Sequence, residues 1–315
     1  MKTIALLDTV HPRFTELITK RGFHIVDLTS FDKEEILSRL DGIHALTIRS
    51  RFQIDKDFID RMPSTLQVIG RYGSGMENID VAYATEKGIR CVHAPEGNRQ
   101  AVAEHALGML LSVFNNLCKA SAEVKSNQWK REENRGEELS GKTVGIIGYG
   151  NTGSAFARLV STFPEVKVLV YDKYKTGFSN GNIIETNEYR IQEEADIVSL
   201  HIPLTAETTH LINSRWIYRM HKPFYLINTS RGQCVDTHSL VEGLKSGKVL
   251  GACLDVLEYE KTSFEGLEQE QLPADFQYLV QHPKVMITPH IAGWSFQSHV
   301  KLAEILAQRI VEALK

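Results

Sequence analysis

Short β-rich runs alternate with helical patterns along almost the whole chain. The candidate strands form two series, one at 3–7, 24–28, 45–49, 67–70 and 90–93, the other at 143–147, 167–171, 197–200, 224–228, 250–254 and 285–288. Helical patterns lie between them, including 13–20, 33–40, 80–87, 152–163, 213–220, 237–246 and 295–314. Because parallel strands need crossover connections that are most often helices, this alternation predicts an α/β fold with parallel sheets covered on both faces.

A long apolar-periodic segment at 98–125 separates the two series of strands, and a polar stretch at 126–141 follows it. The periodicity predicts one long helix, of the kind that joins domains or builds a subunit interface. The chain has 315 residues, and at about 150 residues per domain this length predicts about two domains, or one large one.

Charge and composition narrow the range of partners. Lys and Arg number 36 and Asp and Glu number 39, so the net charge of −3 creates no general field that attracts nucleic acid or an anionic membrane. No apolar run approaches the roughly 20 residues of a membrane span, and Asp8 comes too early for a signal peptide. We therefore expect a cytoplasmic protein with neither a nucleic-acid nor a membrane partner.

The four cysteines are scattered through the chain, at Cys91, Cys118, Cys234 and Cys253. They form no C-x-x-C pair and have no histidine partner at zinc-finger spacing. We therefore expect buried, reduced thiols and no metal site.

A glycine-rich run follows the predicted strand 143–147 and precedes a helical pattern. Gly148 permits a tight turn, Gly150 lets backbone N–H groups approach a pyrophosphate, and Gly153 allows close packing of helix and strand. This strand–turn–helix context makes the pattern typical of a dinucleotide site. The expected contacts are Gly148, Tyr149, Gly150, Asn151, Thr152 and Gly153.

An acidic residue ends the next predicted strand. Asp172 follows Gly153 by 19 residues, the spacing expected of an acid that binds the adenosine ribose. A carboxylate there repels the 2′-phosphate of NADP, so the sequence favours NAD. The neighbouring Lys173 and Lys175 leave NADP open as the alternative.

Several further motifs occur in one order along nearly the whole chain. They are 48–50, 69–80, 95–98, 101–106, 201–205, 228–232 (Asn-Thr-Ser-Arg-Gly), 254–256 and 288–293 (Thr-Pro-His-Ile-Ala-Gly). In these motifs and the glycine loop, the chain resembles the D-isomer-specific 2-hydroxyacid dehydrogenases, most closely the phosphoglycerate dehydrogenase branch.

The resemblance implies two flavodoxin/Rossmann-like doubly wound α/β domains with an interdomain cleft. The substrate-binding domain would comprise residues 1–98 plus 291–315, and the NAD-binding domain residues 99–290. A homodimer through the NAD-binding domain is expected. Because the last predicted helix reaches Lys315, we expect no C-terminal regulatory domain of the kind that many phosphoglycerate dehydrogenases carry.

The same resemblance assigns a catalytic triad. Arg231 matches the arginine that binds the substrate carboxylate and polarises its carbonyl, a task suited to a permanently charged fork of donors. His290 matches the acid/base, because imidazole exchanges protons near neutral pH. Glu260 matches the carboxylate that stabilises imidazolium.

The acidic partner of His290 has a local competitor. Glu258 lies two residues before Glu260, and this chain has Lys261 where the family commonly has proline. Formate dehydrogenases share the fold but pair the histidine with glutamine, which disagrees with Glu260.

Other site residues follow from the resemblance. The substrate carboxylate is expected to bind the backbone amides of Ser74 and Gly75, with Arg49 also near the substrate. Asp255 matches a contact to the nicotinamide carboxamide. Pro203, Thr208 and Thr229 match cleft-wall positions along the cofactor.

The identity of the 2-hydroxy acid depends on nearby arginines. Convergence of two or more of Arg49, Arg51, Arg71 and Arg99 with Arg231 would provide for a second anion and favour 3-phosphoglycerate. The alternative is an unphosphorylated acid related to glyoxylate or hydroxypyruvate. A different class of function, a dinucleotide-sensing protein like the corepressors related to this family, also remains open.

Overall fold

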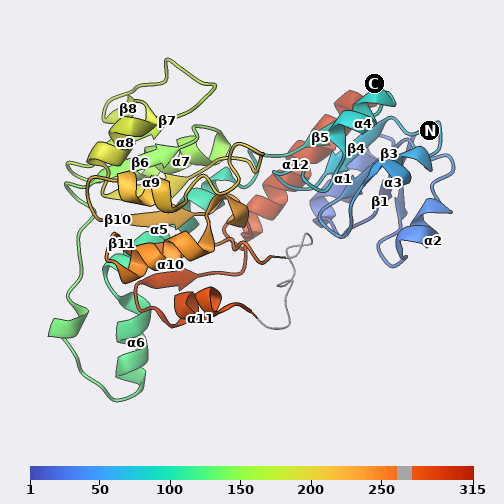
Figure 1. Ribbon diagram of the computed structural model, residues 1–315. Coiled ribbons are helices and arrows are strands. Elements are labelled where there is room, and N and C mark those ends of the chain that lie inside the picture. The colour runs from blue at the N-terminus through green and yellow to red at the C-terminus, as the bar shows by residue number, and fades with distance from the viewer. Residues whose placement is uncertain (261–271) are drawn as a thin grey trace. The chain divides into compact units, whose positions relative to one another are not determined.

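The structure is a computed structural model that describes residues 1–260 and 272–315. The chain forms two compact units, one of residues 1–98 and 294–315 and the other of 99–260 and 272–293. Each unit contains one parallel β-sheet with helices on both of its faces (Figure 1). The expectation of two doubly wound α/β units with parallel sheets is thereby confirmed.

Unit 1, residues 1–98 and 294–315, has a five-stranded sheet in the order β2-β1-β3-β4-β5. This is the flavodoxin-like strand order. The strands are β1 (Thr3–Leu6), β2 (His24–Asp27), β3 (Ala45–Ile48), β4 (Val68–Arg71) and β5 (Arg90–His93). The helices are α1 (Pro12–Lys20), α2 (Lys33–Leu37), α3 (Lys56–Asp60), α4 (Val81–Glu86) and α12 (Phe296–Ala313).

Alternate side chains of the strands face opposite sides of this sheet. Ile4 and Leu6 pack with buried residues of α1 and α12, whereas Ala5 packs on the other face with residues of α2, α3 and α4. The Tyr72 hydroxyl donates a hydrogen bond to the carbonyl of His299 in α12 at 2.8 Å. The last helix of the chain therefore completes the core of the unit that the first residues begin.

Unit 2, residues 99–260 and 272–293, has a seven-stranded sheet in the order β12-β11-β10-β9-β6-β7-β8. The strands are β6 (Thr143–Ile147), β7 (Lys167–Tyr171), β8 (Ile183–Glu185), β9 (Ile197–Leu200), β10 (Phe224–Asn228), β11 (Val249–Leu254) and β12 (Val285–Ile287). The helices are α5 (Arg99–Phe114), α6 (Leu117–Lys125), α7 (Asn151–Val160), α8 (Glu188–Glu194), α9 (Ser214–Arg219), α10 (Thr237–Lys245) and α11 (Ala274–Gln281). Each pair of neighbouring strands is parallel.

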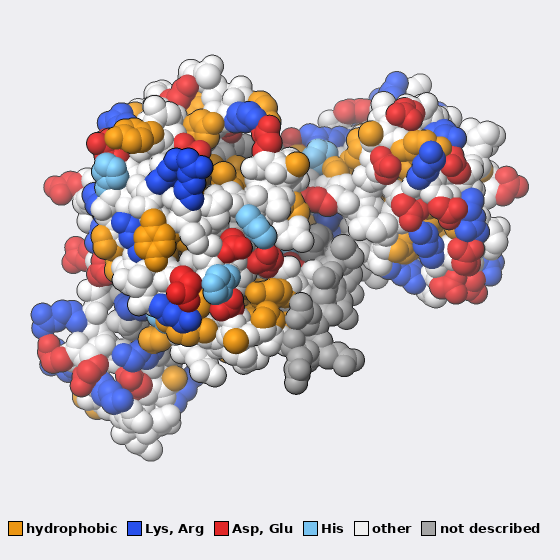
Figure 2. Space-filling view, in the orientation of Figure 1, with side chains coloured by type: hydrophobic (Ala, Val, Ile, Leu, Met, Phe, Trp, Pro, Cys, Tyr) orange, Lys and Arg blue, Asp and Glu red, His pale blue; other side chains and the backbone are white. Residues whose placement is uncertain are grey.

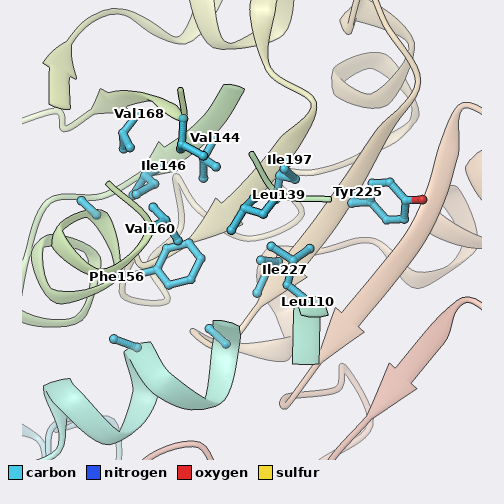
Figure 3. Close-up of a cluster of buried hydrophobic side chains, with 14 of the residues drawn as sticks. Leu110, Leu139, Val144, Ile146, Phe156, Val160, Val168, Ile197, Tyr225 and Ile227 are labelled. Carbon is cyan, nitrogen blue, oxygen red and sulfur yellow. The ribbon is translucent and has the colours of Figure 1, made fainter. Parts of the chain in front are cut away.

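The core of unit 2 also has two layers. On one face Val144 and Ile146 of β6 pack with Leu110 of α5 and Phe156 of α7 (Figure 3). On the other face Ile147 joins a cluster that includes residues of α8, α9 and α10. Full burial of a side chain of this size contributes about 1.5–3 kcal/mol, so these two layers hold the strand ends, and the loops that follow them, in place.

The prediction of one long helix at 98–125 is wrong, because the structure has two helices there. Helix α5 ends at Phe114 and α6 begins at Leu117. Between them Asn116 adopts a left-handed backbone with φ of 52°, a conformation that asparagine tolerates better than most residues. Its side-chain amide donates to the carbonyl of Arg135 at 3.3 Å, which stabilises the break.

The surface carries mixed charge. On the face shown in Figure 2, acidic, basic and hydrophobic side chains are interspersed over both units. Among the helices of residues 1–260 and 272–315, none combines the length and the apolar character needed to cross a lipid bilayer.

Candidate active site

The glycine-rich run forms the turn between β6 and α7, and steric contacts explain two of its glycines. Gly148 has a φ of 97°, and a Cβ there would lie 2.3 Å from the carbonyl oxygen of His201. A Cβ on Gly153 would lie 2.0 Å from the carbonyl oxygen of Gly148. A Cβ on Gly150 would meet open space, and no side chain caps the N-terminus of α7. The turn is thus closely packed at Gly148 and Gly153, and it leaves open space at Gly150, next to the N-terminus of α7.

Asp172, directly after β7, is tied to the same turn. Its Oδ2 accepts a hydrogen bond from the Tyr149 backbone N–H at 2.6 Å, and its Oδ1 accepts from the N–H groups of Tyr174 and Lys175 at 2.9 Å each. Partial burial acts to raise the pKa of Asp172, but these backbone donors and the Lys175 charge outweigh it and hold the pKa below its ordinary value. Asp172 is therefore a carboxylate at neutral pH.

Three further predicted cofactor residues lie in loops after neighbouring strands. The Thr208 hydroxyl donates to the carbonyl of Pro203 at 2.7 Å in the loop after β9. Thr229 directly follows β10, and its hydroxyl oxygen is buried without a hydrogen-bond partner among the residues that the structure describes. Strands β7, β6, β9 and β10 are consecutive in the sheet, so their loops leave from one carboxyl edge, where ligands of open α/β sheets bind.

These observations fit a dinucleotide. The N–H groups at the start of α7 suit a pyrophosphate, Asp172 suits ribose hydroxyls, and the Thr229 hydroxyl offers a buried polar group that no other described residue binds. The residues of this edge therefore have the donor and acceptor chemistry that a nicotinamide dinucleotide requires.

His201 stabilises this region as a neutral side chain. Its Nε2 lies 2.9 Å from the Ser199 hydroxyl, and its Nδ1 lies 3.3 Å from the Thr152 hydroxyl in the first turn of α7. Burial lowers the pKa of His201 to about 3. A histidine held neutral at this position connects β9 to the start of α7 and is unsuited to proton exchange near neutral pH.

His290 and Glu260 form a hydrogen-bonded pair. His290 follows β12 with a left-handed φ of 55°, and its Nδ1 lies 2.7 Å from Glu260 Oε2. The other carboxylate oxygen of Glu260 accepts from the backbone N–H of Leu257. Both side chains are mostly buried, with 24% of His290 and 15% of Glu260 exposed.

Glu258, the competing carboxylate, faces elsewhere. Its Oε1 lies 2.6 Å from His210 Nε2, and its Oε2 accepts from the backbone N–H of Thr237 at 3.0 Å. The geometry thus pairs Glu260 rather than Glu258 with His290. Lys261, which replaces the proline common in the family, lies outside the described residues.

Asp255 supports the backbone around His290. Its carboxylate is 1% exposed and accepts from the Thr288 hydroxyl at 2.6 Å and from the N–H groups of Ile291 and Ala292 at 2.8 Å each. Its backbone carbonyl accepts from the His290 N–H at 2.8 Å. Sequence reasoning missed this anchoring, whereas the contact of Asp255 to a nicotinamide carboxamide stays a prediction.

Arg231 lies in the loop after β10. A guanidinium nitrogen donates to the carbonyl of Ser230 at 2.6 Å. A Cβ on the next residue, Gly232, would lie 2.0 Å from the carbonyl carbon and oxygen of Leu257, so this turn packs directly against the segment that carries Glu260. Because β10, β11 and β12 are neighbours, Arg231, Glu260 and His290 all follow the carboxyl ends of adjacent strands.

The remaining predicted substrate residues belong to unit 1. One oxygen of Asp8 accepts from three successive N–H groups, those of residues 49–51, and so holds the turn that carries Arg49. The Arg49 guanidinium lies 4.9 Å from the ring centre of Trp294. In the loop of Ser74 and Gly75, the Ser74 hydroxyl donates to Asn98 at 2.6 Å.

Comparison with known proteins agrees with this geometry. Residues 107–292 match the NAD-binding domain of the D-isomer specific 2-hydroxyacid dehydrogenases. The chain is 37% identical over 290 residues to a glyoxylate reductase of Thermofilum pendens, a match that covers 90% of this chain and 82% of the relative. It is 32% identical to a hydroxypyruvate reductase of Thermotoga maritima, covering 98% and 96%.

A third relative is longer. The D-3-phosphoglycerate dehydrogenase of Bacillus subtilis is 35% identical over 301 residues, which covers 95% of this chain but 54% of the relative. The chain therefore spans about half the length of that dehydrogenase.

Solved structures are similar over nearly the whole chain. A D-lactate dehydrogenase of Aquifex aeolicus complexed with NAD and lactic acid superposes with a TM-score of 0.81 at 28% identity, covering 98% of this chain and 94% of that one. An acyclic imino acid reductase in complex with NADPH and D-Arg superposes with a TM-score of 0.84 at 25% identity, covering 98% and 96%.

The fold and the site thus define an NAD(P)-dependent oxidoreductase with a doubly wound dinucleotide-binding unit. Within that class, the chain belongs to the D-isomer-specific 2-hydroxyacid dehydrogenase family.

Proposed function

We propose that the protein interconverts a D-2-hydroxy acid and its 2-keto acid with NAD, using Arg231, Glu260 and His290. The observation that carries this proposal is the 2.7 Å contact between His290 Nδ1 and Glu260 Oε2 at the carboxyl edge of the sheet that bears the dinucleotide turn. An imidazole held by a carboxylate is suited to giving and taking one proton near neutral pH.

Each residue has a separate task in this mechanism. The glycine turn, Asp172 and Thr229 would hold a nicotinamide dinucleotide, which would supply or accept the hydride at the substrate carbon. In the reductive direction, His290 donates a proton from Nε2 to the substrate oxygen, while Glu260 at Nδ1 fixes the tautomer and stabilises the imidazolium. Arg231 holds the substrate carboxylate and polarises the carbonyl.

The substitution Glu260→Gln tests these assignments. Without the carboxylate the imidazolium loses its stabilisation, so we expect the upper pH limit of keto-acid reduction to move to lower pH and the rate above neutral pH to fall by about 100-fold. Glu242→Gln is a matched control, because Glu242 forms an ion pair with Lys245 on the surface of α10. A pH profile that is the same for E260Q and the unaltered protein would contradict the assignment.

For the substrate, we propose an unphosphorylated 2-keto acid of the size of glyoxylate or hydroxypyruvate. Two of the arginines that would bind a second anion are engaged by backbone carbonyls of unit 1. Arg51 donates to Leu7 and Thr29 at 3.2 and 2.8 Å, and the buried Arg71 donates to Tyr72 at 3.2 Å. The similarity to a glyoxylate reductase supports the same choice.

The second candidate substrate is 3-phosphoglycerate. It is favoured by Arg49, a cation in the loop after β3 that is expected near the substrate and could bind a phosphate. The relatives named phosphoglycerate dehydrogenase also favour it. In either case Arg49 and the backbone of Ser74 and Gly75 are the substrate contacts that we propose for unit 1.

Steady-state rates separate the two substrates. We expect kcat/KM for glyoxylate or hydroxypyruvate to exceed that for 3-phosphohydroxypyruvate, each measured with NADH. A preference for the phosphorylated acid, abolished by Arg49→Gln, would restore 3-phosphoglycerate as the substrate.

For the cofactor, we propose a preference for NAD over NADP. The Asp172 carboxylate directly follows β7, beside the glycine turn, where it would repel the 2′-phosphate of NADP, and its pKa is held low by the backbone donors described above. Lys173 is paired with Glu207, and the Lys175 ammonium donates to the carbonyl of Tyr149 at 3.0 Å. A higher kcat/KM with NADPH than with NADH would overturn this preference.

For the assembly, we propose a homodimer through unit 2. Helix α6 buries none of its residues, and Leu117, Val124 and the nearby Trp129 are exposed, Trp129 by 79%. Light scattering should give twice the mass of the chain, and the variant L117E/V124E should be a monomer. A monomeric unaltered protein at micromolar concentration would contradict the proposal.

A further inference from the structure

Glu258 is held by three donors from two other segments of unit 2. Its Oε1 accepts from His210 Nε2 at 2.6 Å, and its Oε2 accepts from both the backbone N–H and the hydroxyl of Thr237, at 3.0 and 2.6 Å. A partly buried carboxylate with this many partners has one strongly preferred position. It lies two residues before Glu260, so it limits where the Glu260 side chain can lie.

His210 is itself held in place. Its backbone has a left-handed φ of 50°, and its N–H donates to the carbonyl of Gln233 at 2.8 Å. Its Nδ1 lies 3.8 Å from the carboxylate of Asp236. The imidazole therefore lies between two carboxylates, with the nitrogen at 2.6 Å directed to Glu258.

The backbone between Glu258 and Glu260 is confined from the other side as well. The carbonyl of Leu257 occupies the space that a side chain at Gly232 would need. The Leu257 N–H donates to Glu260, whose other oxygen contacts His290. Two sets of contacts thus converge on residues 257–260, one from Glu258 and one from the turn after Arg231.

Capping of a helix accounts for only part of these contacts. Glu258 accepts from the N–H of Thr237, the first residue of α10, and Asp236 accepts from the Ser239 N–H at 2.7 Å, but neither cap explains the contact of Glu258 with His210. Tyr259 lies between the two acids, and its pKa is raised first by burial and then by the charges of Glu258, Asp275 and Asp236. Arg231 also lies close, because Gly232 packs against Leu257 and Glu258. None of these provides the contact that His210 makes.

We propose that Glu258 and His210 are positioning residues of the dehydrogenase reaction, whose pairing fixes residues 257–260 so that the Glu260 carboxylate is held against His290 Nδ1. Neither residue contacts substrate in this proposal. It rests on the proposed roles of Glu260 and His290, and it assigns a function to the acid that the sequence left as the competitor.

Two substitutions at His210 separate the hydrogen bond from the backbone conformation. His210→Asn keeps a residue that tolerates positive φ but is too short to reach Glu258. His210→Gln places an amide donor near the position of Nε2. Glu258→Gln removes the negative charge and replaces one of the two acceptor oxygens with an amide nitrogen. One of these oxygens faces His210 and the other faces Thr237.

We expect H210N and E258Q to lower kcat for keto-acid reduction by about 10-fold to 100-fold, the range that a displaced catalytic group produces. Their upper pH limit should move in the same direction as in E260Q, and KM for NADH should stay unchanged. H210Q should recover most of the lost kcat. The double variant H210N/E258Q should be no worse than the poorer single variant, because both break one contact.

His238→Asn is the matched control. His238 lies on α10 directly after Thr237, and its Nδ1 is 3.0 Å from a carboxylate oxygen of Asp275, but the side chain is 71% exposed. We expect H238N to have the kcat and pH profile of the unaltered protein.

Thermal melting and NADH binding by fluorescence establish that each variant is folded. Variants that bind NADH but retain the unaltered kcat and pH profile, with or without a lower Tm, would overturn the proposal. Equal kcat in H210N and H210Q would also overturn it. If E260Q itself leaves the pH profile unchanged, the proposed function fails instead, so the two failures are distinguishable.

Discussion

A glycine-bearing turn follows an inner strand in each of the two units, and the two turns are occupied differently. In unit 2, the turn after β6 leaves open space around Gly150 and carries no side chain at the N-terminus of α7. In unit 1, the turn after β4 contains Gly73, with a φ of 153°, and the Arg71 guanidinium lies 1.4 Å from where a Cβ would be.

The helices after these turns differ in the same way. Helix α4 of unit 1 is capped by Asp80, whose carboxylate accepts from the Tyr83 N–H at 3.0 Å, whereas α7 has Gly150 as its cap. Backbone donors that a protein carboxylate already binds are not available to an anion. Similar parallel sheets are therefore followed by an open helix N-terminus in unit 2 and by a capped helix in unit 1.

The largest predicted effect separates two glycines of the unit 2 turn. In Gly153→Ala the new methyl group overlaps the Gly148 carbonyl, so we expect NADH affinity to fall at least about 100-fold, or about 2.8 kcal/mol. Gly150→Ala meets no atom within 4 Å. It should keep the Tm of the unliganded protein and weaken NADH binding alone. Fluorescence titration and thermal melting check both, and equal Tm losses would contradict the comparison.

A second effect concerns the turn of unit 1. Gly73→Ala displaces the Arg71 guanidinium and strains a positive φ, so we expect it to reduce the free energy of unfolding by about 1–3 kcal/mol. NADH affinity should not change, because the dinucleotide contacts that we propose all lie in unit 2. In Arg71→Ala/Gly73→Ala the overlap is gone, so the added cost of Gly73→Ala should shrink. Denaturant unfolding of the four proteins measures this coupling, and strict additivity would contradict it.

The smallest effect, taken over a single pH unit, is a pH dependence carried by His201 of unit 2. Its pKa is about 3 in the folded chain and about 6.5 when unfolded. Between these values only the unfolded chain binds the proton, so stability falls as pH decreases below about 6.5, by at most about 1.4 kcal/mol per pH unit. His201→Gln should flatten this slope in urea unfolding experiments. An unchanged slope would show that His201 is protonated in the folded state.

Much of the fold was predictable because its signals are local. The strands of both sheets follow β-rich runs, and the turn after β6 follows from glycines that the backbone itself requires. The break between α5 and α6 was not predictable from periodicity, because apolar residues continue on both sides of Asn116. The short strand β8 and helix α8 were missed for the related reason that each is too brief to show a clear period.

The sequence by itself determined the glycine turn, since close backbone approach at Gly148 and Gly153 allows no larger residue, and its alternation of β-rich runs with helical patterns determined that the sheets are parallel. Only the tertiary structure decided between Glu258 and Glu260. These two acids are separated by one residue in an irregular segment, where no helical or strand period dictates the direction of a side chain. Their partners, His210 and His290, come from segments on either side in the chain, and the hydrogen bonds formed on folding direct each acid to its own histidine.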